Sequence, residues 1–328
     1  MTLSIQLICY IDLNSWNNEL QNEGAKVELV LIILPVFIIF FIGFVGQKLI
    51  GFDIKSISTV ALYLMSPFLA FRTFYTNALT MEYFYIVLFC LILAFILLII
   101  TWVVGTFMKT TRSELSAMIL GGMFMNSGNY GAPVVLFALG ATGFDYAVMI
   151  MVLHGLFINT FGIFFASLGG GEKATWKQSL HRVIRMPVVY AAAIGILLQE
   201  SQVTVPQAVI NGVGLVADAS IPTVMLVLGM QLAVISRKKV AYRYVAAVSV
   251  IRIIVSPLLA VGILYFLPVN DPVKQVAIIL AAMPTAANTT MLALQFNTEP
   301  DLVSFTTLVT TLVSIFSIPL VLFFLGIS

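Results

Sequence analysis

A short polar string lies inside a long apolar run in the first half of the chain. Residues 126–133 read Asn-Ser-Gly-Asn-Tyr-Gly-Ala-Pro, within an apolar stretch that covers about 115–139. Asn126, Ser127 and Asn129 supply amide and hydroxyl groups, which hydrogen-bond a carboxylate without carrying a charge themselves. Polar side chains are costly at the middle of a bilayer, so we interpret them as a candidate binding site.

The same string contains residues that interrupt a helix. Gly128 and Gly131 weaken it through their flexibility, and Pro133 removes a donor and clashes with the preceding turn. We expect a broken helix whose freed backbone groups also bind the ligand, because open backbone at this depth must line a wet cavity or be buried in protein. A kink that only permits close packing is the alternative. Tyr130 could stack on a ligand, but packing is its default role.

Composition places these residues in a membrane protein. The chain has 328 residues, of which 61% are hydrophobic and 9% charged, and its mean hydropathy is +1.08. A soluble domain carries about 25% charged residues, so we predict an all-α polytopic membrane protein in contact with lipid. The net charge of +2 gives no support for a nucleic-acid partner. Walker-type and HExxH motifs are absent from the sequence, and we expect neither a cofactor nor a metal. Cys9 and Cys90 are interpreted as unpaired thiols.

Ten apolar runs are long enough to cross a bilayer. They cover about 27–48, 56–77, 83–108, 114–139, 144–168, 186–200, 206–236, 240–267, 273–296 and 302–327. We therefore divide the chain into an N-terminal extension (1–26), a first five-span unit (27–168), a linker (169–185) and a second five-span unit (186–328).

The distribution of Lys and Arg predicts the orientation. With the N-terminus outside, twelve of these residues fall in inner loops and three on the outer side. Because positive charge is enriched on the cytoplasmic side, we expect a protein of the cell membrane with both termini outside.

The two units look like copies of each other. Pro67 and Pro222, which we interpret as helix breaks in spans 2 and 7, are separated by 222 − 67 = 155 residues. The same offset places Asn129 over Pro284 and Pro133 over Asn288. An odd number of spans per unit makes the second copy inverted, and paired broken helices are typical of a transporter's binding site.

The second break should supply further ligand groups. Pro284, Thr285, Asn288 and Thr289 lie in span 9 and combine a helix breaker with an amide and two hydroxyls. Half-helix N-termini attract carboxylates, so two breaks meeting near the midplane favour an anionic ligand. Coincidence among proline-containing spans is the alternative.

Three ionisable residues lie within apolar runs. Asp218 in span 7 and Arg252 in span 8 are interpreted as a charge pair that acts as a conformational latch or a proton-linked coupling site. The alternatives are a static buried pair, or an Asp218 that reaches the outer interface because span 7 is misplaced. His154 in span 5 could relay protons, but a lone histidine in a helix bundle more often hydrogen-bonds a neighbour.

The string 126–133, the ten-span layout and the segment 284–288 resemble the prokaryotic branch of the auxin efflux carrier family. The resemblance covers roughly 27–328. It implies secondary carriers of organic anions such as auxins or malonate-like dicarboxylates, working by elevator-type alternating access. It also implies inverted five-helix repeats, crossing helices 4 and 9, scaffold helices 1, 2, 6 and 7, transport helices 3–5 and 8–10, and a homodimer. The short linker 169–185 departs from the plant members, which have a long central loop.

Other classes fit the sequence less well. A proton- or sodium-coupled transporter of the bile-acid-symporter-like fold remains the alternative, although a cation antiporter site needs midplane carboxylates that spans 3–5 and 8–10 lack. A channel needs a ring of charges or carbonyls. An intramembrane enzyme needs a nucleophile and a base, and only Ser127 with His154 suggests one.

Overall fold

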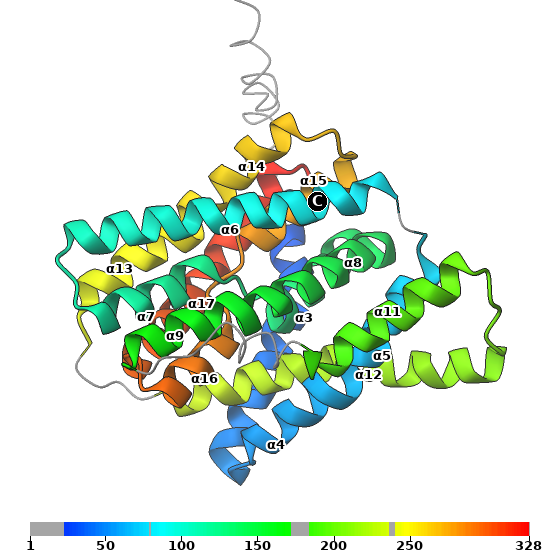
Figure 1. The fold of residues 1–328 in the computed structure, drawn as a ribbon, viewed down its shortest axis with the longest axis horizontal. Helices are drawn as coiled ribbons and strands as arrows, with labels where there is room; N and C mark the ends of the chain where they lie inside the picture. The colour runs from blue at the N-terminus through cyan, green and yellow to red at the C-terminus, as the bar shows by residue number, and fades with distance from the viewer. Residues whose placement is uncertain (1–22, 79, 172–183, 236–239, 328) are drawn as a thin grey trace, which may run out of the picture.

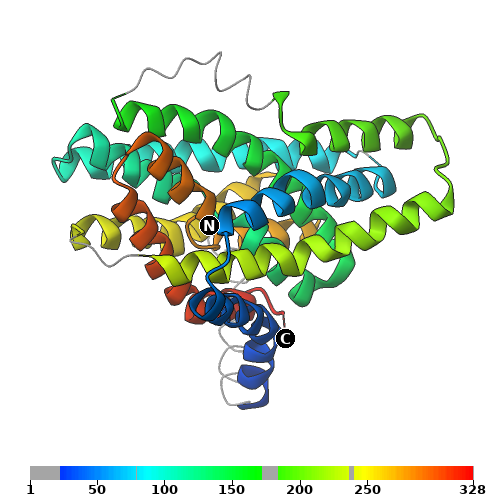
Figure 2. The ribbon, with the colours of Figure 1, turned by 90° about the horizontal axis from the view of Figure 1, so that it is seen from below.

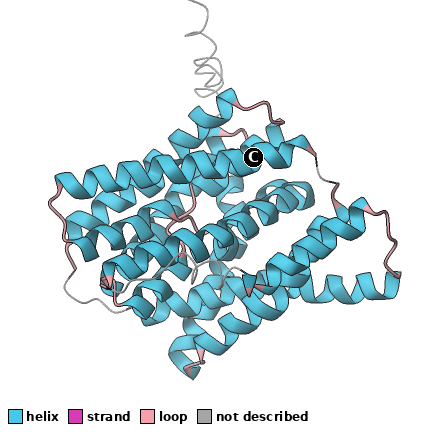
Figure 3. Ribbon diagram, in the orientation of Figure 1, coloured by secondary structure: helices cyan, strands magenta, loops and turns pink. Residues whose placement is uncertain are grey.

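The computed structural model describes residues 23–78, 80–171, 184–235 and 240–327, with the backbone alone described at 23–30. All regular elements in these ranges are helices (Figure 3), which confirms the predicted all-α class. The linker 169–185 and the N-terminal extension 1–26 lie largely outside the described residues.

Short π-helical turns interrupt several of the helices. The first half contains α3 (Glu23–Ile50), α4 (Ile54–Thr59), η1 (Val60–Met65), α5 (Ser66–Thr76), α6 (Met81–Phe107), α7 (Arg112–Met123), η2 (Ser127–Gly131), α8 (Ala132–Phe157), η3 (Ile158–Gly162) and α9 (Ile163–Gly169). The second half contains α11 (Pro187–Glu200), α12 (Gln207–Val234), α13 (Tyr242–Val250), η4 (Ile251–Val255), α14 (Ser256–Phe266), α15 (Asp271–Ala281), α16 (Ala287–Phe296) and α17 (Pro300–Phe324).

Within the described residues, seven helical segments are long and apolar enough to cross a membrane. Ten spans were predicted, and three features of the helices account for the difference. The helix α11 has only 14 residues, and α15 and α16 are separated short helices. The segment 127–169 counts once, although Gly140 has a non-helical conformation (φ 68°, ψ −160°) between predicted spans 4 and 5.

One group of helices is held together by close backbone packing. The helices α3, α5, α11 and α12 contact one another, and they occupy the lower part of Figure 1 together with α4. A Cβ added to Gly43 of α3 would lie 2.2 Å from the Leu226 carbonyl oxygen, and one added to Gly229 of α12 would lie 2.0 Å from that of Phe40. Small residues allow such approach in membranes, where packing rather than the hydrophobic effect drives association. We call these helices the first group.

The remaining helices form a second group. Here α6 packs on α7, α7 on α9, α15 on α8, and both α13 and α16 on α17. Figure 1 shows α6, α7, α9 and α13 together in its upper left part. The two groups meet where α3 and α5 contact α8, and where α3 contacts α17, a contact visible at the lower edge of Figure 2.

Pro67 and Pro222 do not break their helices, so the prediction of breaks at these positions is wrong. Pro67 is the second residue of α5 and follows η1 without a non-helical residue, because the π-helical turn accommodates the change. Pro222 lies inside the continuous helix α12. Beside it, the Thr223 hydroxyl donates to the Ala219 carbonyl at 2.7 Å. Membrane helices tolerate proline where neighbouring groups satisfy the carbonyl that it frees.

Candidate functional site

The two interrupted segments predicted from the sequence cross each other. Backbone leaves the helical conformation after α7 and again before α16, and the two extended stretches run antiparallel. The Asn126 N–H donates to the Pro284 carbonyl at 2.8 Å, and the Ala286 N–H donates to the Phe124 carbonyl at 2.9 Å. The breaks therefore satisfy each other's backbone groups, which open backbone inside a membrane protein requires.

Side chains from the second break fix this crossing. The Thr285 hydroxyl donates to the Gly121 carbonyl at 2.8 Å, and the Thr310 hydroxyl accepts from the Thr285 N–H at 3.2 Å. The Thr289 hydroxyl donates to the Ala286 carbonyl at 2.7 Å. Both threonines are fully buried and already paired, so they support the crossing rather than face an open space.

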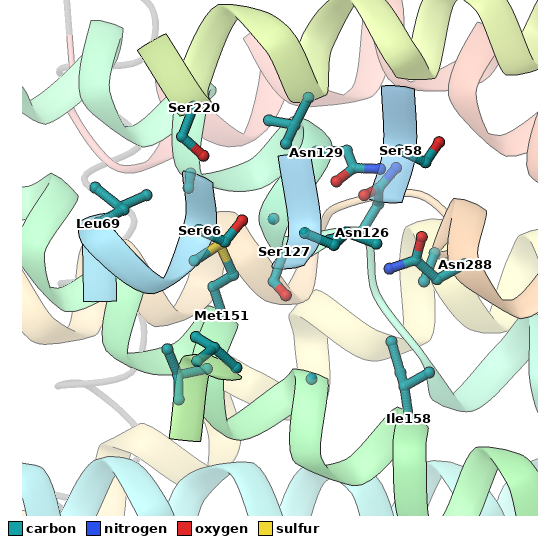
Figure 4. A pocket seen from close by; sticks show the side chains of 18 of the residues that line it. Ser58, Ser66, Leu69, Asn126, Ser127, Asn129, Met151, Ile158, Ser220 and Asn288 are labelled. Carbon is teal, nitrogen blue, oxygen red and sulfur yellow. The ribbon is translucent and has the colours of Figure 1, made fainter. Parts of the chain in front are cut away.

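A cavity of about 350 Å³ lies on one side of the crossing, between the two groups of helices (Figure 4). The first group contributes residues of α4, η1, α5, α11 and α12, and the second contributes residues of η2, α8, η3 and α16. Among the predicted site residues, those that line it are Asn126, Ser127, Gly128, Asn129, Pro133 and Asn288. Those that do not are Tyr130, Gly131, Pro284, Thr285 and Thr289.

The Asn126 side chain brings an unpaired hydrogen-bond donor to this cavity. It is only 4% exposed, and its Nδ2 has no hydrogen-bond partner among the described residues. A buried donor without a partner in the protein is available to a ligand or to water. Figure 4 shows Asn126, Asn129 and Ser58 gathered together, with Asn288 on the same side of the cavity. The hydroxyl of Ser58 also lacks a described partner.

Helix ends add positive potential to the same place. The turn η2 and α8 begin beside Asn126, and α16 begins beside Asn288. The first N–H groups of a helix have no partner within it, and a helix N-terminus carries roughly half a positive charge. Pro133 is the second residue of α8, directly after the π-helical turn η2. Apart from Lys55, the lining side chains are uncharged, and the helix ends attract an anion.

Tyr130 is a packing residue in this structure. Its ring is fully buried and contacts the rings of Phe37 and Phe40 edge-on, at centroid distances of 5.8 and 5.1 Å. Its hydroxyl accepts a hydrogen bond from Ser314 at 3.0 Å. Tyr130 thereby joins η2 to α3 and α17, away from the cavity lining.

The predicted pairing of Asp218 with Arg252 is wrong. Asp218 forms an ion pair with Nη1 of Arg72 at 2.6 Å, and its side chain is 69% exposed. Arg252 is 0% exposed, and its nitrogens donate to the Ser256 hydroxyl and to backbone carbonyls of α7 and α15. The two residues belong to different surroundings: one joins α5 to α12 at the surface, and the other lies at the crossing.

His154 also lies at the crossing. Its Nε2 accepts a hydrogen bond from the Met125 N–H at 3.0 Å, and its ring packs against Phe124. A ring nitrogen that accepts a bond carries no proton, so this histidine supports the extended backbone in a neutral form. The proton-relay role remains a hypothesis.

Several lining residues were not predicted. Ser58, Ser66 and Gln231 come from the first group of helices, and so does Lys55, an exposed residue of α4. The sequence signal was present, since Gln231 and the serines are polar residues in apolar runs. It was weak because single serines occur in many membrane helices.

Comparison with known proteins agrees with this geometry. A family model described as "Membrane transport protein" matches residues 29–322. An "Uncharacterized transporter" of Methanothermobacter thermautotrophicus is 25% identical over 91% of this chain and 96% of its own length. A "Putative malonate transporter" of Rhizobium meliloti is 23% identical over 88% of this chain and 93% of its own length.

These relatives are named as transporters rather than enzymes. The family match covers most of the chain, including both interrupted segments and the cavity between the helix groups. The chain therefore belongs to the membrane transport protein family, the auxin efflux carrier type, and is a multi-pass membrane transporter.

Proposed function

We propose that this chain is a secondary carrier of a small carboxylate in the cell membrane. The observation that supports this most is the buried, unpaired amide nitrogen of Asn126 beside two helix N-termini. A carboxylate accepts hydrogen bonds from an amide donor and is favoured by the positive helix ends, whereas a cation is favoured by neither. The cavity volume of about 350 Å³ lies within the range of small-molecule sites.

A second anionic group on the cargo has a partner of its own. Lys55 lines the cavity, is exposed, and forms no ion pair with another described residue. A dicarboxylate could place one group near Asn126 and the other toward Lys55. The relative from Rhizobium meliloti, named for malonate, is consistent with a short dicarboxylate as cargo.

We further propose ten membrane crossings arranged as two inverted repeats. The end of α9 at Gly169 and the end of α17 at Phe324 are separated by 324 − 169 = 155 residues, the same offset as that between Pro67 and Pro222. In this arrangement α7 with the start of α8 forms one broken span, and α15 with α16 forms the other. The short helix α11 corresponds to α3.

The position of the cavity supports an elevator mechanism. The first group of helices corresponds to the scaffold and the second to the transport domain, and the cavity lies between them. Both helix N-termini and all four asparagines of the lining belong to the second group, so the cargo's main contacts would move with that group. The first group contributes mostly apolar side chains and isolated hydroxyls.

The lining also suggests which side is open. The cavity lining includes Lys55, Asn159, Pro187 and Gln231. Each of these residues lies toward the end of its predicted span that the distribution of Lys and Arg places on the cytoplasmic side. We interpret the structure as a cytoplasm-facing state.

Exchange across proteoliposomes tests this function. Protein reconstituted with internal malonate should take up external labelled malonate saturably, with no product formed. Malonamide, the uncharged diamide of similar size, is the matched control and should neither exchange nor compete. Equal competition by malonamide would contradict an anion site. Exchange that fails for malonate but succeeds for another carboxylate would retain the site and correct the cargo.

A further inference from the structure

We propose that Arg252 is a built-in cation at the helix crossing, which holds the C-terminal ends of both broken helices and excludes sodium from this position. The proposal concerns ion coupling and does not depend on which cargo the cavity binds.

The guanidinium of Arg252 lies between two helix ends. Its Nη1 donates to the carbonyls of Gly122 and Met123 at 3.1 and 3.2 Å, and these are the last two residues of α7. Its Nη2 donates to the Ser256 hydroxyl and, at 2.8 Å, to the carbonyl of Ala281. Ala281 is the last residue of α15. One planar fork thus connects both half-helices.

This arrangement compensates the negative potential of the two helix C-termini that meet at the crossing. Each helix C-terminus carries roughly half a negative charge and up to four carbonyls without an intrahelical partner. Two such ends meet here in the protein interior, where leaving them uncompensated is costly. One positive charge is the amount that two half-charges require.

Among the described residues, the printed partners of this arginine are three backbone carbonyls and the Ser256 hydroxyl, all of them uncharged. None of the described carboxylates lies within ion-pair distance of it, and the Ser256 hydroxyl that accepts from it also donates to the Ala281 carbonyl at 2.7 Å. His154, which also lies at the crossing, accepts a hydrogen bond through Nε2 and adds no charge of its own. Arg252 is therefore the local cation.

Carbonyl groups at half-helix C-termini are also what coordinate sodium in transporters with discontinuous helices. A guanidinium bonded to these carbonyls occupies the space and satisfies the potential that would attract a sodium ion. We infer that sodium does not bind at this crossing, so any sodium coupling would require another site.

Thermal unfolding of purified protein tests the inference without any cargo. We expect the melting temperature of the parent to be the same in sodium chloride and in choline chloride at equal ionic strength. Arg252→Ala should melt lower, and sodium or millimolar guanidinium should raise its melting temperature by about 2 °C or more, because a bound ion stabilises the folded state. Choline, which is too large, should not.

Arg72→Ala is the matched control, because it removes an arginine whose partner is a surface carboxylate. It should show no rescue by guanidinium and no response to sodium. A merely structural role for Arg252 would lower the melting temperature but would not create a response to small cations.

Two results with a folded Arg252→Ala would overturn the proposal: sodium raising the melting temperature of the parent at least as much as that of the variant, or a variant that responds to neither sodium nor guanidinium. If Arg252→Ala does not fold, Arg252→Lys retains a charge and should fold with a lower, sodium-independent melting temperature. Sodium stabilisation of Arg252→Lys would also refute the proposal. Because no carboxylate is present in these measurements, their failure leaves the proposed cargo untouched.

Discussion

Replacing Asn126 with leucine should separate binding from stability. Leucine has nearly the shape of asparagine but lacks the amide, so it removes the unpaired Nδ2 and leaves the backbone bond to Pro284 in place. We expect weaker carboxylate binding together with an empty protein that is at least as stable as the parent.

The magnitudes follow from the burial of this donor. A hydrogen bond to a charged group contributes about 1.5–3 kcal/mol, which corresponds to roughly ten- to hundredfold weaker binding when it is lost. In the empty state a buried donor without a partner costs about 1–3 kcal/mol, and the leucine removes this cost. The two effects have opposite signs because the ligand supplies the partner that the protein lacks.

Titration of a confirmed substrate, with thermal unfolding of the empty protein, measures both effects. Asn211→Leu is the matched control, since Asn211 is exposed on α12 and does not line the cavity. Asn129→Ala and Asn288→Ala should also weaken binding about ten- to hundredfold. Unchanged affinity in all three site variants would refute the site. A loss of affinity that merely follows a loss of stability would refute the reasoning for Asn126.

Three further predictions concern packing, the surface ion pair and orientation. Gly229→Ala should lower the melting temperature because its Cβ would meet a carbonyl of α3, whereas Gly212→Ala, which faces open space, should not; equal effects would argue against the close approach. Asp218→Asn should change the free energy of unfolding by less than about 1 kcal/mol, because its partner Arg72 and the pair itself are partly solvated; a double-mutant cycle with Arg72→Ala checks this. After replacement of the native cysteines, a cysteine at Gln202 should react with an impermeant thiol reagent only from outside, and labelling from the cytoplasm would reverse the orientation.

Local chemistry explains which parts of the fold could be predicted from the sequence. The predicted tenth span at 302–327 corresponds to α17 at Pro300–Phe324, and the sixth at 186–200 to α11 at Pro187–Glu200. Apolar length and proline at helix starts are properties of neighbouring residues, so they can be predicted without knowing what packs on them. The interruptions around Gly128 and Pro284 were predictable for the same reason.

Local chemistry was a weaker guide to proline inside a helix. Pro222 was predicted to break α12, but the helix continues through it. Whether a proline breaks a helix depends on what satisfies the freed carbonyl, and in membranes those groups come from tertiary neighbours.

Sequence alone determined that this is a membrane protein, that its helices are interrupted around Gly128 and Pro284, and that these two interruptions carry neutral donors. Only the tertiary structure decided which of those donors face a cavity: Asn126 and Asn288 do, whereas Tyr130 and Thr285 are used in packing and in the crossing. It also decided the partner of each charge, because the carbonyls that Arg252 contacts in α7 are about 130 residues away in the chain. A helix break follows from bonds between residues four apart, but the direction and partner of a side chain depend on helices that meet only when the chain is folded.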